Sequence, residues 1–181
     1  MKREGHSFKR RLTAFLVVLA LAGLISVLAT TLLSDRDTRS DGFALGEEAP
    51  PIQGVDTAGQ RIALQDYRGQ AVVVNFWASW CKPCVQEMPL IDEAYREGKF
   101  KLISVNAGES KGTVNEYLRE HGISFPVLID ATGQASDRYR VVGLPATFVI
   151  DEQGRLSRMG VGELTDREQL DALLSGAGEE S

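Results

Sequence analysis

The sequence predicts an α/β domain with a mixed central sheet and helices on both faces, an N-terminal hairpin extension, and one preceding transmembrane helix. Strand-like and helix-like segments alternate through the first half of the domain, which is typical of parallel strands joined by right-handed crossovers. Two strand-like runs separated by a short turn follow, and they indicate antiparallel strands at one side of the sheet. An uncharged apolar run before the domain predicts the membrane span.

The elements can be predicted in order along the chain. Residues 52–55 and 61–64 flank a turn and predict the hairpin extension. Residues 71–78 are almost entirely apolar, β-branched or aromatic, which is typical of a central strand buried on both faces. The later elements are a helix over 82–97, a strand over 100–105, a helix over 113–121 closed by Gly122, a strand over 126–129, a short helix over 136–139, a hairpin of 146–151 with 155–161, and a last helix that begins at Thr165 with Glu168 as its capping box.

Residues 12–33 carry no charge and, at about 1.5 Å per residue, are long enough to span a membrane. The flank before them is strongly basic and the flank after them is mixed. The positive-inside rule therefore predicts a single-pass protein of the cell membrane, with residues 1–11 in the cytoplasm and the rest on the extracytoplasmic face. Residues 34–47 are predicted to be a polar linker, residues 48–177 the folded domain, and residues 178–181 a disordered tail.

A cleaved signal peptide is the alternative for the N-terminal segment. Such peptides have apolar cores of about 7–15 residues and a cleavage site with small residues. Residues 20–22 and 27–29 offer such sites, but the length of the apolar run favours an uncleaved signal-anchor.

The overall charge excludes one broad class of partner. The net charge is −5 and the isoelectric point is about 5.1, without the basic patch that a nucleic-acid-binding surface requires. The short basic cluster near the N-terminus is explained by the membrane flank. We therefore expect no nucleic-acid partner.

The chain has only two cysteines, Cys81 and Cys84, and their spacing allows four interpretations. A structural disulfide that closes so short a loop would stabilise the domain by only roughly 2 kcal/mol. A structural zinc site needs four ligands, and the two histidines, His6 and His121, do not supply a usable set because His6 is predicted to lie across the membrane. Haem attachment needs a histidine directly after the second cysteine, where this chain has Val85.

A redox role is favoured because the pair follows a buried strand and opens a helix. The unpaired N–H groups and the dipole at a helix start stabilise a thiolate, so Cys81 is predicted to attack a disulfide. Cys84 lies one turn further into the helix and is predicted to resolve the mixed disulfide. Pro83 suits the first turn, where its missing N–H costs nothing. We expect no metal and no cofactor other than this redox-active disulfide.

The segment NFWASWCKPC resembles the active-site segment of the thioredoxin superfamily, and the resemblance extends over residues 48 to about 175. VVGLPATFVID resembles the cis-proline segment of that superfamily. The resemblance implies a thioredoxin-like fold with a cis peptide bond between Leu144 and Pro145 facing the cysteines, and substrate contacts from these two residues and Trp80.

Two acidic residues place the chain near the TlpA/ResA-like branch. Many thioredoxins have an aspartate where this chain has Asn75, which cannot titrate. Glu87 follows Cys84 by three residues, on the same helical face, and matches a CxPCxxExP pattern of that branch, so it is predicted to handle protons. Without the resemblance, a solvated position would be the simpler interpretation of Glu87. Glu109 falls where ResA-like proteins place a second acid near the active site.

The resemblance also implies a function. ResA-like proteins reduce the disulfide in the haem-binding CxxCH segment of apocytochrome c, and a CcdA-type membrane carrier reduces them in turn. The same function is expected here. The alternatives are reduction of another exported protein, as in spore-envelope assembly, a thioredoxin-like peroxidase, and a non-catalytic binding module. A peroxidatic Pro-x-x-x-Thr-x-x-Cys motif is absent from the sequence.

Overall fold

The computed structural model describes residues 19, 21–24 and 43–175 of the chain. The chain divides into two units, residues 1–42 and residues 43–181, and the few described residues of the first unit are helical. None of the helices among the described residues combines the length and the apolar character that a membrane span needs. The predicted span over 12–33 lies largely outside the described residues, as does the predicted tail over 178–181, so both stay predictions.

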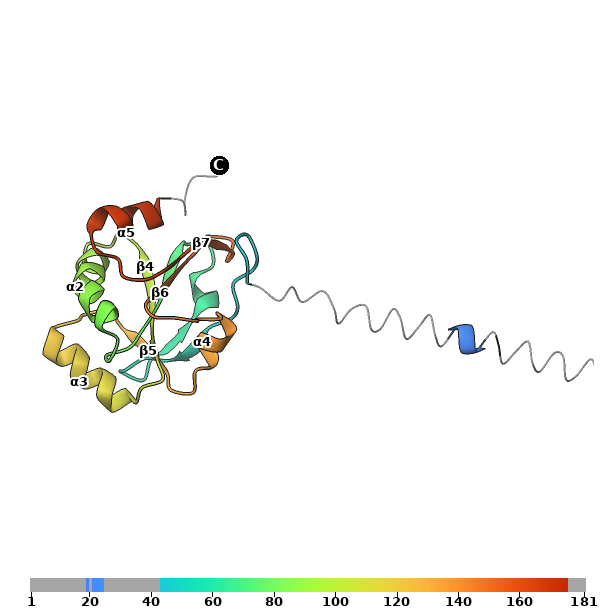
Figure 1. Cartoon of the computed structure of the whole chain (residues 1–181), viewed down its shortest axis with the longest axis horizontal. Helices are drawn as coiled ribbons and strands as arrows, with labels where there is room; N and C mark the ends of the chain where they lie inside the picture. The colour runs from blue at the N-terminus through green and yellow to red at the C-terminus, as the bar shows by residue number, and fades with distance from the viewer. Residues whose placement is uncertain (1–18, 20, 25–42, 176–181) are drawn as a thin grey trace, which may run out of the picture. The chain divides into compact units, whose positions relative to one another are not determined.

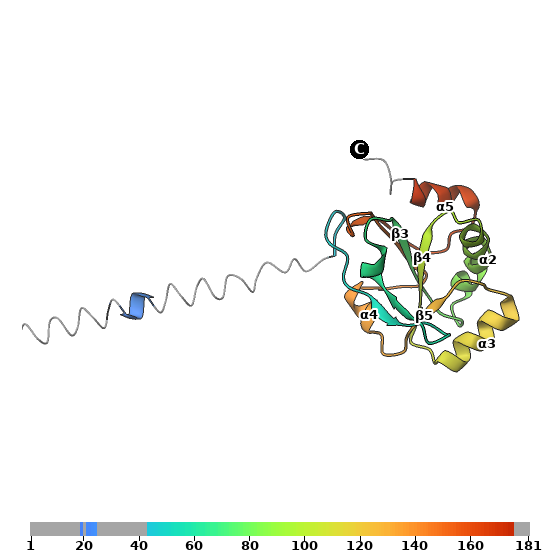
Figure 2. The same ribbon diagram turned by 180° about the vertical axis from the view of Figure 1, so that it is seen from behind.

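A five-stranded mixed sheet forms the centre of the second unit (Figures 1 and 2). The strand order is β5-β4-β3-β6-β7; β3 pairs parallel to β4, and β4 to β5, while β6 and β7 join antiparallel on the other side. This arrangement confirms the predicted parallel strands and the closing hairpin. The strands are β3 (Val72–Trp77), β4 (Lys101–Ala107), β5 (Val127–Asp130), β6 (Ala146–Ile150) and β7 (Leu156–Val161).

Both faces of β3 are buried, because alternate side chains enter two separate hydrophobic clusters. Val72, Val74 and Phe76 belong to one cluster, whereas Val73 and Trp77 belong to the other. The continuous apolar run in the sequence therefore reflects a central strand with a core on each side.

Helices cover both faces, as predicted. Figure 1 shows α2 (Lys82–Arg96) and α3 (Lys111–His121) on one side of the sheet and α4 (Gln134–Arg138) on the other. The start of α3 lies before the predicted residue 113 because Ser110 caps it, its hydroxyl accepting a hydrogen bond from the Thr113 N–H. Its end is as predicted, at Gly122 in a left-handed conformation with φ of 65°.

The predicted start of the last helix was wrong. Helix α5 spans Arg167–Leu174, and its cap is Asp166, whose carboxylate accepts a hydrogen bond from the Gln169 N–H at 2.9 Å. Gln169 in turn accepts from the backbone N–H of Thr165 at 3.2 Å. The capping pattern is therefore Asp-x-x-Gln, and Glu168 takes no part in the hydrogen bonds of this cap.

The hairpin extension forms a separate two-stranded sheet of β1 (Gln53–Val55) and β2 (Arg61–Ala63), followed by the short helix η1 (Leu64–Tyr67). It packs against the edge of the central sheet, where Gly54 lies against the side chain of Leu128 in β5. A Cβ atom at position 54 would approach Leu128 to 3.2 Å, so the missing side chain allows this close contact.

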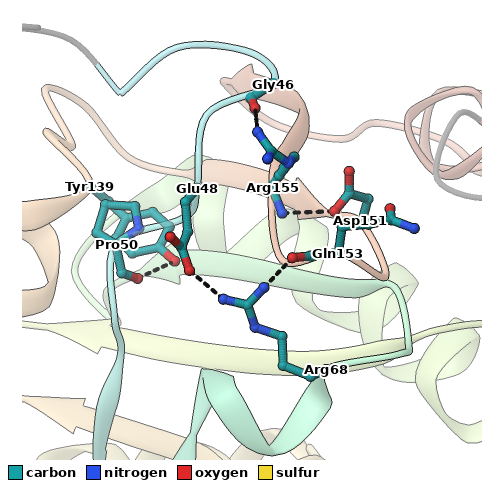
Figure 3. A network of polar contacts seen from close by, with 8 residues as sticks. All are labelled: Gly46, Glu48, Pro50, Arg68, Tyr139, Asp151, Gln153 and Arg155. Atoms are coloured by element: carbon teal, nitrogen blue, oxygen red, sulfur yellow. Dashed lines mark hydrogen bonds and ion pairs between the residues drawn. The ribbon is translucent and has the colours of Figure 1, made fainter.

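The folded domain begins before the predicted boundary at residue 48, because the preceding residues contact it (Figure 3). The backbone of residues 46 and 47 pairs with Leu156 of β7, and Arg155 donates to the Gly46 carbonyl at 2.9 Å. The guanidinium of Arg68 joins the carboxylate of Glu48 to the carbonyl of Gln153. Residues 43–47, predicted to be linker, therefore form part of the domain.

Replacing Phe43 with alanine is expected to lower the free energy of unfolding by roughly 2 kcal/mol, less than the ~3–5 kcal/mol of a fully buried phenylalanine. Phe43 is half-buried, and its ring centroid lies 5.2 Å from that of Tyr139 and 6.0 Å from that of Phe148. Urea unfolding of the full chain measures the loss. Leu45→Ala is the control, because Leu45 is exposed. Equal losses for the two variants would place Phe43 outside the cooperative domain.

Candidate active site

The two cysteines lie where β3 leads into α2. Cys81 is the N-cap of α2, and its sulfur accepts a hydrogen bond from the Cys84 N–H at 3.3 Å. Pro83 occupies the first turn, where a missing backbone donor is tolerated. The end of a buried strand thus presents Cys81 at the positive end of a helix dipole.

Cys81 and Cys84 form a disulfide, with their Cα atoms 5.2 Å apart. Cys84 is fully buried, whereas 6% of Cys81 remains exposed. This difference agrees with the predicted order of events, because the outer sulfur is the one that a substrate can reach first. Both cysteines of the chain are used in this bond.

Glu87 is buried on α2, three residues after Cys84, with only 1% of its surface exposed. The solvated interpretation of this residue is therefore wrong. Its Oε1 accepts a hydrogen bond from Asn75 Nδ2 at 3.0 Å, and its Oε2 accepts one from the Leu164 N–H at 2.9 Å. Glu87 is thus held by β3 on one side and by the segment between β7 and α5 on the other.

Burial raises the pKa of Glu87 from its ordinary value of 4.5 to about 7, because a charged carboxylate loses its hydration there. The negative charge of Glu163 adds to this rise, while the hydrogen bonds from Leu164 and Asn75 oppose it. A carboxyl group with this pKa is present in both protonation states near neutral pH, as a group that moves protons must be.

The partners of Glu87 were not predicted from the sequence. Asn75 also donates to Thr147 Oγ1 at 3.1 Å, and the strand register places these two residues opposite each other on β3 and β6. Each is a polar residue inside an otherwise apolar strand, which was the available signal. The contact from Leu164 is made by the backbone and leaves no signal in the sequence.

Glu109 lies after β4 and acts on the segment before the cysteines. Its carboxylate accepts hydrogen bonds from the Ser79 N–H at 2.7 Å, from the Ser79 hydroxyl at 2.5 Å, and from Asn106 Nδ2 at 2.7 Å. Ser79 precedes Cys81 by two residues. Glu109 therefore holds the segment that leads from β3 to Cys81. Among the described residues, it has no hydrogen bond with Glu87.

The peptide bond between Leu144 and Pro145 is cis, as predicted. Pro145 is buried and its carbonyl accepts a hydrogen bond from the Gly162 N–H at 2.9 Å. Leu144 packs against both hydrophobic clusters, including the one that contains the cysteines. Trp80, next to Cys81, is 71% exposed, so its indole is free to contact another molecule.

Comparison with known proteins agrees with this geometry. Residues 45–159 match the AhpC/TSA family model. The thiol-disulfide oxidoreductase ResA of Geobacillus kaustophilus is 35% identical over 168 residues, which cover 91% of this chain and 92% of that protein. The chain belongs to the ResA-like thiol-disulfide oxidoreductases of the AhpC/TSA family. It is therefore an enzyme of thiol-disulfide exchange.

Solved structures of related proteins share the fold. A structure described as a putative thiol:disulfide interchange protein DsbE from Chlorobium tepidum is 31% identical, with a TM-score of 0.67 over 75% of this chain and 99% of that one. StoA from Bacillus subtilis is 25% identical, with a TM-score of 0.62 over 69% of this chain and 96% of that one. The central sheet and its helices are thus those of a thioredoxin-like protein.

Glu87→Gln is expected to change how stability depends on pH. The unfolded chain loses the Glu87 proton near pH 4.5, whereas the folded chain keeps it until about pH 7. The folded state therefore binds more protons in this window, and the free energy of unfolding falls as the pH rises, by about 3 kcal/mol from this group. Glutamine cannot titrate, so the variant should lack this fall.

Urea unfolding of the oxidised full chain at several pH values across this window measures the effect. Glu93→Gln is the matched control, because Glu93 lies on the same helix but is exposed. The control curve should run parallel to that of the wild type. A Glu87→Gln curve that also ran parallel would show that Glu87 titrates normally.

Proposed function

We propose that this ResA-like enzyme is a membrane-anchored reductase whose catalytic domain lies on the extracytoplasmic face, and that it reduces the disulfide of apocytochrome c before haem is attached. The observation that carries the proposal is a disulfide at the start of a helix that also holds the buried carboxyl group of Glu87, one turn after Cys84. The name of the ResA relative supports the exchange chemistry. The choice of substrate rests on the resemblance described above.

The reaction begins from the reduced dithiol. The thiolate of Cys81 attacks one sulfur of the substrate disulfide, forming a mixed disulfide and releasing the other substrate sulfur as a thiolate, which takes up a proton. Cys84 then loses its proton and attacks the sulfur of Cys81. The second substrate sulfur leaves as a thiolate and takes up a proton, so the substrate departs as a dithiol that has gained two electrons. The enzyme has lost these two electrons and now holds the disulfide seen here.

Glu87 is suited to the second step. Cys84 is fully buried, so its proton needs an acceptor inside the protein. Glu87 follows Cys84 by one helical turn and has a pKa raised to about 7. As a carboxylate it can take the proton of Cys84, and it returns a proton when the disulfide is reduced again.

The same carboxyl group favours reduction over oxidation of substrates. A negative charge near the pair disfavours a second negative charge on sulfur. Strong oxidants of this kind depend on a stabilised thiolate in the reduced form. The burial of Glu87 therefore supports a reductase.

Leu144 offers a backbone site for the substrate. Neither its N–H nor its C=O forms a hydrogen bond with another of the described residues. An extended peptide could pair with these groups, while the exposed Trp80 contacts its side chains. This would place a substrate disulfide close to Cys81.

Electrons must come from the cytoplasm, because the extracytoplasmic space is oxidising. We propose a CcdA-type membrane thiol-disulfide carrier as the reductant, with residues 12–33 as the anchor.

The proposed orientation can be tested with protease, added to cells whose outer layers have been removed but whose cell membrane is closed. The protease should degrade the catalytic domain and leave the cytoplasmic part of the chain intact. A domain protected until the membrane is opened would contradict this orientation.

Cys84→Ala is expected to trap the substrate. Without the resolving cysteine, the mixed disulfide through Cys81 persists, so non-reducing electrophoresis should show an adduct that thiol reagents release. The double variant Cys81→Ala with Cys84→Ala is the control and should form none. Mass spectrometry then identifies the partner: apocytochrome c supports the proposal, and another exported protein in its place would replace it.

Cys81→Ala tests the role in cells. Loss of the attacking thiol should abolish holocytochrome c, because oxidised CxxCH segments do not bind haem covalently, and an external thiol reductant should restore it. Haem-staining gels measure the product. Normal cytochrome c levels in this variant would contradict the proposed substrate.

A further inference from the structure

The side chain of Asn75 has an unequal set of partners. Its Nδ2 donates two hydrogen bonds, to Glu87 at 3.0 Å and to Thr147 at 3.1 Å. Its Oδ1 is buried and has no hydrogen-bond partner within the described residues. The amide thus uses both donors and leaves its acceptor spare.

The observed hydrogen bonds suit only the ionised form of Glu87. Both carboxylate oxygens accept, one from Asn75 and one from the Leu164 N–H. A carboxylate can accept at both oxygens, but a neutral carboxyl group carries an O–H that must donate. Both of its present partners are donors, so the O–H of a neutral Glu87 would find no acceptor in either of them.

A half-turn of the Asn75 amide about its Cβ–Cγ bond removes the conflict. Oδ1 would then take the place of Nδ2 and accept from the Glu87 O–H with one lone pair. The second lone pair would accept from the Thr147 hydroxyl, which can donate as well as accept. Glu87 would keep its bond from Leu164, so these groups make three hydrogen bonds in either state. The group of Asn75 without a partner would change from Oδ1 to Nδ2, which would take the place of Oδ1.

We propose that Asn75 is a positioning residue for Glu87, and that its amide turns over when Glu87 gains or loses a proton. The amide thereby holds the carboxyl group in one place in both protonation states. This inference rests on the proposed function in one respect only, that Glu87 carries protons for Cys84. An aspartate at position 75 could not act in this way, because it has no N–H to donate to a carboxylate.

Few other charges act on Glu87. Beside it on α2 is the disulfide, which does not titrate, while β3 and β6 contribute the neutral Asn75 and Thr147. The segment between β7 and α5 contributes the Leu164 N–H and the carboxylate of Glu163. In the oxidised enzyme, Glu87 is therefore the titrating group in hydrogen-bond contact with Asn75.

The chain allows a direct test, because it contains only three asparagines, Asn75, Asn106 and Asn115. The oxidised full chain is labelled with ¹⁵N-asparagine, and the side-chain amide signals are followed by NMR from about pH 5 to about pH 9. Asn75→Ala and Asn106→Ala assign the signals by the loss of one each. Asn106 is the matched control, because it also is a buried amide that donates to a glutamate, Glu109.

Both Nδ2 protons of Asn75 should shift together as the pH falls, because both lose their hydrogen bonds when the amide turns. Their contacts with the Thr147 methyl group, seen as nuclear Overhauser effects, should change with the same midpoint. The Asn106 signals should not follow that midpoint. A shift of only the proton that faces Glu87, with the proton that faces Thr147 unchanged, would overturn the proposal.

Glu87→Gln provides a second test that does not depend on titration. Glutamine has nearly the shape of a protonated glutamate and presents an N–H donor as well as an oxygen. The Asn75 signals of this variant at high pH should match those of the wild type at low pH. Signals that stay at the wild-type high-pH position would overturn the proposal. Failure of the Cys84→Ala trap would instead count against the substrate and leave this result unaffected.

Discussion

Burying the carboxyl group of Glu87 is the constraint around which the active site is built. An acid in an apolar core is tolerated only where donors replace its hydration. Two elements outside α2 supply these donors: β3 through Asn75, and the segment after β7 through the backbone of Leu164. Strand β6 supports the first of them, because Thr147 accepts the other hydrogen bond of the Asn75 amide. The polar positions inside two otherwise apolar strands are therefore explained by one side chain on a neighbouring helix.

Most of the fold could be predicted because the strong signals are local. An apolar β-branched run and a glycine after an amphipathic segment each report on their own surroundings. The errors occurred where two local patterns compete. Thr165-x-x-Glu168 and Asp166-x-x-Gln169 are both acceptable caps, offset by one residue, and only the observed backbone selects the second. The start of the domain was misplaced for a related reason, since residues 43–47 look polar and gain their partners only from β7 and the core.

The candidate site also has features that the sequence predicts and contacts that it does not predict. The cysteine pair, the cis-proline and the spacing of Glu87 are visible in short motifs. The contact between Asn75 and Thr147 depends on pairing β3 with β6, strands separated by most of the domain, and no local pattern gives that register. Glu109 was placed near the active site by resemblance, but its actual partner, Ser79, required the position of the loop after β4.

The position of Thr147 on β6 links the proposed substrate-binding residue Leu144 to the buried acid Glu87. This residue lies two positions after the cis-proline, on the strand that continues from Leu144, and it shares the Asn75 amide with Glu87. If a peptide bound at Leu144, as proposed, shifted this strand, it would disturb the hydrogen bond between Asn75 and Thr147 and with it the proton affinity of Glu87. Thermodynamic linkage makes the effect reciprocal, so the state of the acid must alter the affinity for the peptide by the same factor. One coupling free energy would then set both the effect of peptide binding on the proton affinity of Glu87 and the effect of the Glu87 proton on peptide affinity.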